Sequence, residues 1–112
     1  MVKTNVVFTV EVIDATAVVL SDAIRIDRNS VFSVWAKADA TGTPDLVIDY
    51  LLSWRQDQDF VAPETGDSLT LSDKLAHVDA VVLPISMYMI IRVTGGGSNP
   101  ADTVLDLVLQ MS

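Results

Sequence analysis

Apolar and polar residues alternate with a period of two along most of this chain. The clearest run covers residues 46–54, in which every even-numbered residue is apolar, whereas Asp49 and Ser53 occupy odd-numbered positions. Successive side chains of a β-strand point to opposite faces, so this pattern predicts a strand with one face in a core and the other at least partly in water. The same alternation predicts strands over residues 6–13, 30–37, 86–94 and 104–111.

Shorter apolar segments lie between these runs and are separated by residues that favour turns. Residues 40–44 and 95–102 contain glycine and proline among other turn formers, which suits connections between neighbouring strands. A single helical turn is possible at residues 72–77, where Ser72 would cap it, but it is too short to define the class. The shorter segments predict strands over residues 17–20, 24–26, 68–71 and 78–83.

Together these patterns predict an all-β protein, an antiparallel β-sandwich of about eight short strands. Both a jelly-roll and an immunoglobulin-like order of strands fit the sequence. A chain of 112 residues suits one hydrophobic core, so we expect residues 1–112 to form a single domain. The mean hydropathy of +0.41 is high for a domain this small, which leaves apolar surface for a partner.

Charge and residue content limit the partners and the compartment. The net charge is −8, with fifteen acids against seven scattered bases, so nucleic-acid phosphates would be repelled. No apolar run approaches the roughly 18–20 residues of a membrane-spanning helix, so we expect no membrane association. The first residues show no secretion signal, and cysteine is absent, which favours synthesis in a reducing cytoplasm.

The titratable residues predict no enzymatic site and no cofactor. His77, flanked by Asp73 and Asp79, is the single histidine, and none of the serines lies in a G-x-S-x-G elbow. A surface histidine beside acids is commoner than a catalytic one, so we expect replacement of His77 by alanine to leave function nearly intact. The glycines at 95–97 are followed by no lysine and lie between strands, which favours a hairpin loop over a phosphate site.

A metal site would have to use oxygen ligands, because one histidine without cysteine cannot supply a zinc or copper site. Asp57 and Asp59, with Glu64 and Asp67, could hold calcium. They lack the full spacing of a calcium loop, so a solvated acidic turn is the preferred interpretation, and no metal ligand is predicted.

The aromatic residues allow a second interpretation. Trp35, Tyr50, Trp54 and Tyr88 are of the kind that stack on sugars in carbohydrate-binding modules. The first three fall in strand runs rich in apolar residues, so we expect them in the core.

Residues 84–103, PISMYMIIRVTGGGSNPADT, resemble the end of small β-sandwich structural proteins from tailed-bacteriophage virions. The likeness consists of a strand, a loop rich in glycine and asparagine, and an Ala-Asp-Thr entry to the last strand. It implies a non-enzymatic head decoration or cement protein, often oligomeric, that binds the major capsid protein or other virion proteins. Such a protein would be made in the host cytoplasm and act at the capsid surface, stabilising the lattice by bridging subunits.

Two other functions stay open, namely a carbohydrate-binding module and a tail or baseplate component of the same virion. The segment 88–91 has apolar residues at both its odd and its even positions, so both faces of this strand are apolar. In a two-layer sandwich one of these faces should remain exposed. We therefore expect a homo-oligomer or docking on a larger assembly. The residues predicted to contact a partner are Tyr88, Ile90, Gly95, Gly96, Gly97 and Asn99.

Overall fold

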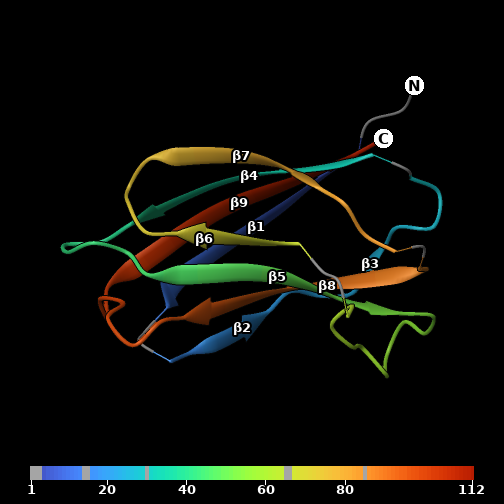
Figure 1. Ribbon diagram of the computed structural model, residues 1–112, viewed down its shortest axis with the longest axis horizontal. Coiled ribbons are helices and arrows are strands. Elements are labelled where there is room, and N and C mark those ends of the chain that lie inside the picture. Colours follow the sequence, from blue (N-terminus) through green and yellow to red (C-terminus); the bar gives the residue numbers. More distant parts are fainter. Residues whose placement is uncertain (1–3, 14–15, 30, 65–66, 85) are drawn as a thin grey trace.

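Two antiparallel β-sheets face each other in the computed structural model, which describes residues 4–13, 16–29, 31–64, 67–84 and 86–112 (Figure 1). Alternating apolar residues make these segments strands, and turn-forming residues separate them. The strands are β1 (Thr4–Ile13), β2 (Val18–Leu20), β3 (Ile24–Arg25), β4 (Phe32–Asp39), β5 (Leu46–Ser53), β6 (Ser68–Leu71), β7 (Ala76–Val81), β8 (Tyr88–Gly95) and β9 (Thr103–Met111).

One sheet, here called the β1 sheet, has the strand order β1-β9-β4-β7. The other, the β2 sheet, has the order β2-β8-β5-β6, and β3 pairs with β8 beyond β2. The pairs β1–β9, β2–β8, β4–β7 and β5–β6 are nested, as in a single long hairpin rolled into two layers. The all-β sandwich predicted from the sequence is confirmed, and its strand order is that of a jelly roll.

The possible helical turn at residues 72–77 is absent. The chain bends at residues 73–75, where the Asp73 carboxylate accepts a hydrogen bond of 2.9 Å from the Leu75 backbone N–H. A short acidic side chain that bonds the backbone two residues ahead favours a turn over a helix. As a result β7 begins at Ala76, two residues before the start expected from the sequence. No helix in the described ranges is long and apolar enough to cross a membrane.

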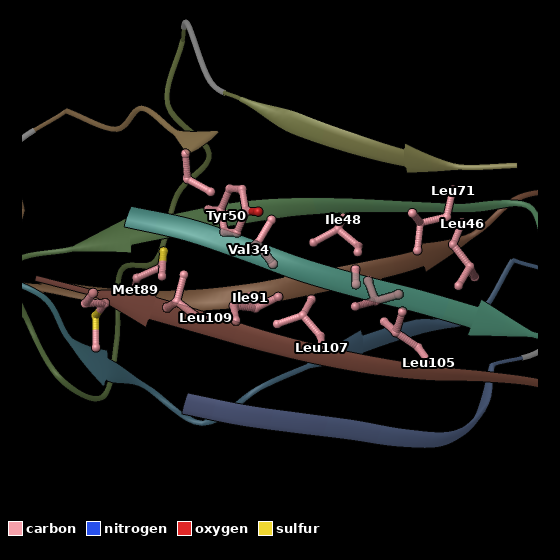
Figure 2. Packing of buried hydrophobic residues seen from close by; sticks show 14 of the residues in the cluster. Val34, Leu46, Ile48, Tyr50, Leu71, Met89, Ile91, Leu105, Leu107 and Leu109 are labelled. Carbon is pink, nitrogen blue, oxygen red and sulfur yellow. The ribbon is translucent and has the colours of Figure 1, made fainter. Parts of the chain in front are cut away.

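The core lies between the two sheets and is filled by alternate residues of the central strands (Figure 2). β4 contributes residues of even number, with Val34, Ala36 and Ala38 fully buried, and β9 contributes residues of odd number. The burial of each large aliphatic side chain stabilises the fold by roughly 1.5–3 kcal/mol. The fully buried residues of largest volume are Val34, Leu46, Ile48, Leu71, Met89, Ile91, Val93, Thr103, Leu105, Leu107 and Leu109.

Candidate interaction surfaces

The outer face of the β2 sheet carries a ring of apolar side chains that the core does not cover. Val18 and Leu20 on β2 are 58% and 51% exposed, and Val47 on β5 is 36% exposed. Leu51 and Ile90 lie opposite each other on β5 and β8 and are half-buried. Opposite residues of antiparallel strands lie on the same face, so these five side chains share one surface. We call it the β2-sheet face.

A neutral ion pair occupies the middle of the β2-sheet face. Arg92 on β8 lies opposite Asp49 on β5 and next to Leu20 on β2. Its Nε donates a hydrogen bond of 2.9 Å to Asp49 Oδ1, and its second guanidinium nitrogen donates to Oδ2. The hydrogen bond to this carboxylate raises the pKa of Arg92, so the guanidinium stays charged. The two side chains are 34% and 24% exposed, and they are held in one bidentate arrangement.

The outer face of the β1 sheet carries a narrower apolar row. Trp35 on β4 lies opposite Val78 on β7 and Val108 on β9, and the three residues line one concavity. Trp35 is 38% exposed, so the expectation that it lies in the core is wrong. It shares its parity with Ser33 and Lys37, while the opposite parity of β4 faces the core. The polar neighbours at the same parity were the signal for its outward position.

Trp54 also lies outside the core, contrary to expectation, and is 66% exposed. β5 ends at Ser53, whose hydroxyl donates to the Gln58 carbonyl at 2.6 Å and accepts from the Arg55 N–H at 3.0 Å. These bonds turn the chain, so the alternation that buries Tyr50 and Leu52 does not continue. Trp54 instead borders a concavity of about 410 Å³ whose lining includes Arg55, Asp59, Val61, Pro63 and Pro84.

The loop between β8 and β9 is tied to the loop that precedes β5. Asn99 is buried, and its Oδ1 accepts hydrogen bonds from the Asp45 N–H at 2.9 Å and the Thr103 hydroxyl at 3.0 Å. The Gly96 N–H donates to the Asp45 carbonyl at 2.8 Å. A Cβ at Gly96 would lie 2.0 Å from Asp45 Oδ2, so the Asp45 carboxylate occupies space that a larger residue at position 96 would need.

The six residues predicted to contact a partner therefore fall in two places. Tyr88 and Ile90 are half-buried on the outer side of the β2 sheet. Gly95 is buried and bonds through its N–H to the Ala17 carbonyl, whereas Gly97 is exposed at the loop tip. Figure 1 shows this loop at the far end of β8 from Tyr88. Contact of these residues with a partner stays a prediction, but the geometry does not bring them into one site.

Several of the titratable residues singled out in the sequence contact neighbouring residues of the chain. His77 Nε2 lies 2.8 Å from Asp73 Oδ1, and this hydrogen bond lowers the pKa of the Asp73 carboxyl. Asp67 accepts a hydrogen bond from the Val82 N–H at 2.8 Å, and Asp59 lies 3.9 Å from Arg55 Nε. Within the described ranges, no group of three or more histidine or acidic residues could hold a metal ion.

Comparison with solved structures shows chains of similar fold. No protein-family model matches the chain, and no curated protein sequence matches it. A chain from a solved structure described as "Bacillus endospore appendages form a novel family of disulfide-linked pili" is similar, with a TM-score of 0.60 and 16% sequence identity. The match covers 98% of this chain and 85% of that chain. At this identity the likeness shows that the two chains share a fold.

Proposed function

We propose that this chain is a non-enzymatic structural protein that packs against other protein subunits in a larger assembly. The observation that carries this proposal is the exposure of apolar side chains on the outer faces of both sheets. Val18 and Leu20 on one face, and Val78 on the other, are each more than half exposed in the single chain. Apolar surface on both sides of a small sandwich marks protein contacts, because its burial is favourable and its exposure promotes aggregation.

Two finer versions of this proposal differ in what the subunit joins. The resemblance of residues 84–103 to virion structural proteins supports a decoration protein on the major capsid protein at a phage head surface, or a tail or baseplate component. The matched structure concerns pili, which supports a subunit that joins copies of itself. We place the capsid version first because the sequence resemblance supports it. The experiment below distinguishes binding to capsids from self-association.

The assembly proposal is tested by measuring the association of the purified protein with itself and with capsids. We expect sedimentation velocity to show larger species as the concentration rises, or co-sedimentation with phage capsids. A variant with Leu20→Glu and Val78→Glu together places a charge on each outer face and should lose both kinds of association. Circular dichroism should still show a sheet spectrum, because both side chains are exposed. A wild-type protein that stays monomeric and ignores capsids at high concentration contradicts the proposal.

Carbohydrate binding is a second candidate, favoured by the exposed indole of Trp54. An indole plate beside the guanidinium of Arg55 and the carboxylate of Asp59 can stack on the apolar face of a sugar and bond its hydroxyls. We expect glycan-array binding by the wild type to fall at least about tenfold in Trp54→Ala, given the energy of an aromatic contact. Trp35→Ala, on the outer face of the β1 sheet, is the matched control. Absence of binding to any glycan, or equal losses in both variants, rules out this candidate.

A further inference from the structure

The β2-sheet face differs from the rest of the surface in its charge. Its outward positions on β2, β8, β5 and β6 hold two charged residues, Asp49 and Arg92, and these neutralise each other. On β3, Arg25 lies opposite Tyr88 and is paired with Asp27. The whole chain carries a net charge of −8, so two copies repel each other over most approaches. A second concavity on the outer face of the β1 sheet, apart from the one beside Trp35, is lined by Asp39, Asp102 and Asp106 with Lys37. Repulsion between two identical chains is therefore weaker where two β2-sheet faces meet than where two of these acidic concavities meet.

The ion pair is also complementary to a copy of itself. A guanidinium has five N–H donors in a plane, and the bidentate contact with Asp49 uses two of them. Across a two-fold axis, Arg92 of one copy would lie against Asp49 of the partner subunit, and the reverse contact would form at the same time. The remaining donors then gain acceptors, which offsets the cost of removing the pair from water.

The area of the β2-sheet face suits a small contact between subunits. Its strands β2, β8, β5 and β6 contain 3, 8, 8 and 4 residues, which at about 3.4 Å per residue and about 4.8 Å per strand give a face of roughly 380 Å². Two such faces bury about 750 Å² before the relief of the side chains is counted, so the contact belongs to the small, weakly associating class of interfaces. Val18, Leu20, Val47, Leu51 and Ile90 would form the apolar part of this contact.

We propose that the β2-sheet face packs against the same face of a second copy of this chain across a two-fold axis. The apolar ring around the Asp49–Arg92 pair then becomes the centre of the interface. This inference rests on the proposed structural role and adds to it the identity of one partner. In a larger assembly the outer face of the β1 sheet would remain available for a contact with a different subunit.

The sharpest test exchanges the two charges within one chain. A double variant with Asp49→Arg and Arg92→Asp keeps an ion pair on the face with its direction reversed. Two copies of the double variant remain complementary, and so do two wild-type copies, but a mixed dimer places like charges together. We expect native mass spectrometry of mixed, mass-labelled proteins to show both homodimers, with heterodimers reduced at least about tenfold from the statistical share.

A second variant keeps the test decisive if the double exchange does not fold. Leu20→Glu changes a side chain that is half exposed, so the single chain should remain folded, and the dimer dissociation constant should rise at least about tenfold. Val78→Glu on the opposite sheet is the matched control and should leave the dimer intact. Folding of each variant is checked by circular dichroism.

The outcomes separate this inference from the proposed function. Free formation of mixed dimers, or a dimer lost in Val78→Glu and kept in Leu20→Glu, overturns the β2-sheet interface while the structural role stands. A wild type that is monomeric alone but binds capsids also overturns it, with the same consequence. A wild type that neither associates with itself nor binds capsids contradicts both proposals.

Discussion

Replacement of Leu107 by alanine is expected to lower the free energy of unfolding by about 3 kcal/mol, the largest loss we predict for a single truncation. Leu107 is fully buried near the middle of β9, which is paired on both sides. Its neighbour across the β4 pairing is Ala36, which is too small to fill the cavity that the truncation leaves. Urea unfolding followed by circular dichroism would measure the change.

Val104→Ala is the matched control for this prediction. Val104 lies on the same strand but at the opposite parity, and its side chain is 37% exposed on the outer face. Removal of an exposed side chain leaves no cavity, so its effect should stay below about 1 kcal/mol. A larger loss in Val104→Ala than in Leu107→Ala would mean that the parity of β9 is reversed, with its odd-numbered residues facing water, and equal losses would contradict the difference in burial between the two side chains.

The period-two pattern predicted the long strands because burial on one face requires it. The run at residues 104–111 is an example, since every odd-numbered side chain from Leu105 to Met111 is buried. The four-residue strand β6 also matched its expected bounds, because turn formers flank it. The choice of a jelly roll over an immunoglobulin-like order lay beyond the sequence. It depends on which distant strands pair, and many pairings bury the same faces.

The candidate surfaces were harder to predict than the core. Val18, Val19 and Leu20 are all apolar, so parity cannot say which of them face outward. The pairing of β2 with β8 determines which residues face outward. Leu20 lies opposite Arg92, so its side chain lies on the same outer face of the sheet. The Asp49–Arg92 pair likewise depends on the register between β5 and β8, which are separated by two other strands in the chain.

The misplaced tryptophans have two separate causes. The apolar residues in the run at residues 30–37 favour the core for Trp35, although the polar residues two positions away on each side, Ser33 and Lys37, indicate an outward face. Trp54 fits the alternation of β5, but the side chain of Ser53 ends the strand one residue earlier. Local hydrogen bonds from a serine compete with strand pairing, and no hydrophobic pattern records them.

Asn99→Ala is expected to lower the free energy of unfolding by about 2 kcal/mol. Asn99 Oδ1 accepts hydrogen bonds from the Asp45 N–H and the Thr103 hydroxyl. The single hydroxyl proton of Thr103 can also go to the Pro100 carbonyl, at 2.7 Å, so Thr103 keeps an acceptor, but the half-buried Asp45 N–H loses its acceptor. Thermal unfolding would measure the loss of stability. Hydrogen exchange of the Asp45 amide should accelerate more than that of the core amides, because the two loops separate locally.

The control for this variant is Ser98→Ala in the same loop. The Ser98 hydroxyl is exposed and donates to the Asp45 carboxylate at 3.0 Å, so its removal should change stability by less than about 0.5 kcal/mol. A much larger loss of stability in Asn99→Ala than in Ser98→Ala would show that Asn99 holds the loop in place. A partner at this loop would then contact the exposed Gly97 rather than the buried Asn99 amide. Equally small losses of stability in the two variants would instead support the partner contact that the sequence predicts for Asn99. A capsid-binding or self-association assay on Asn99→Ala would then show a loss of binding without a loss of stability.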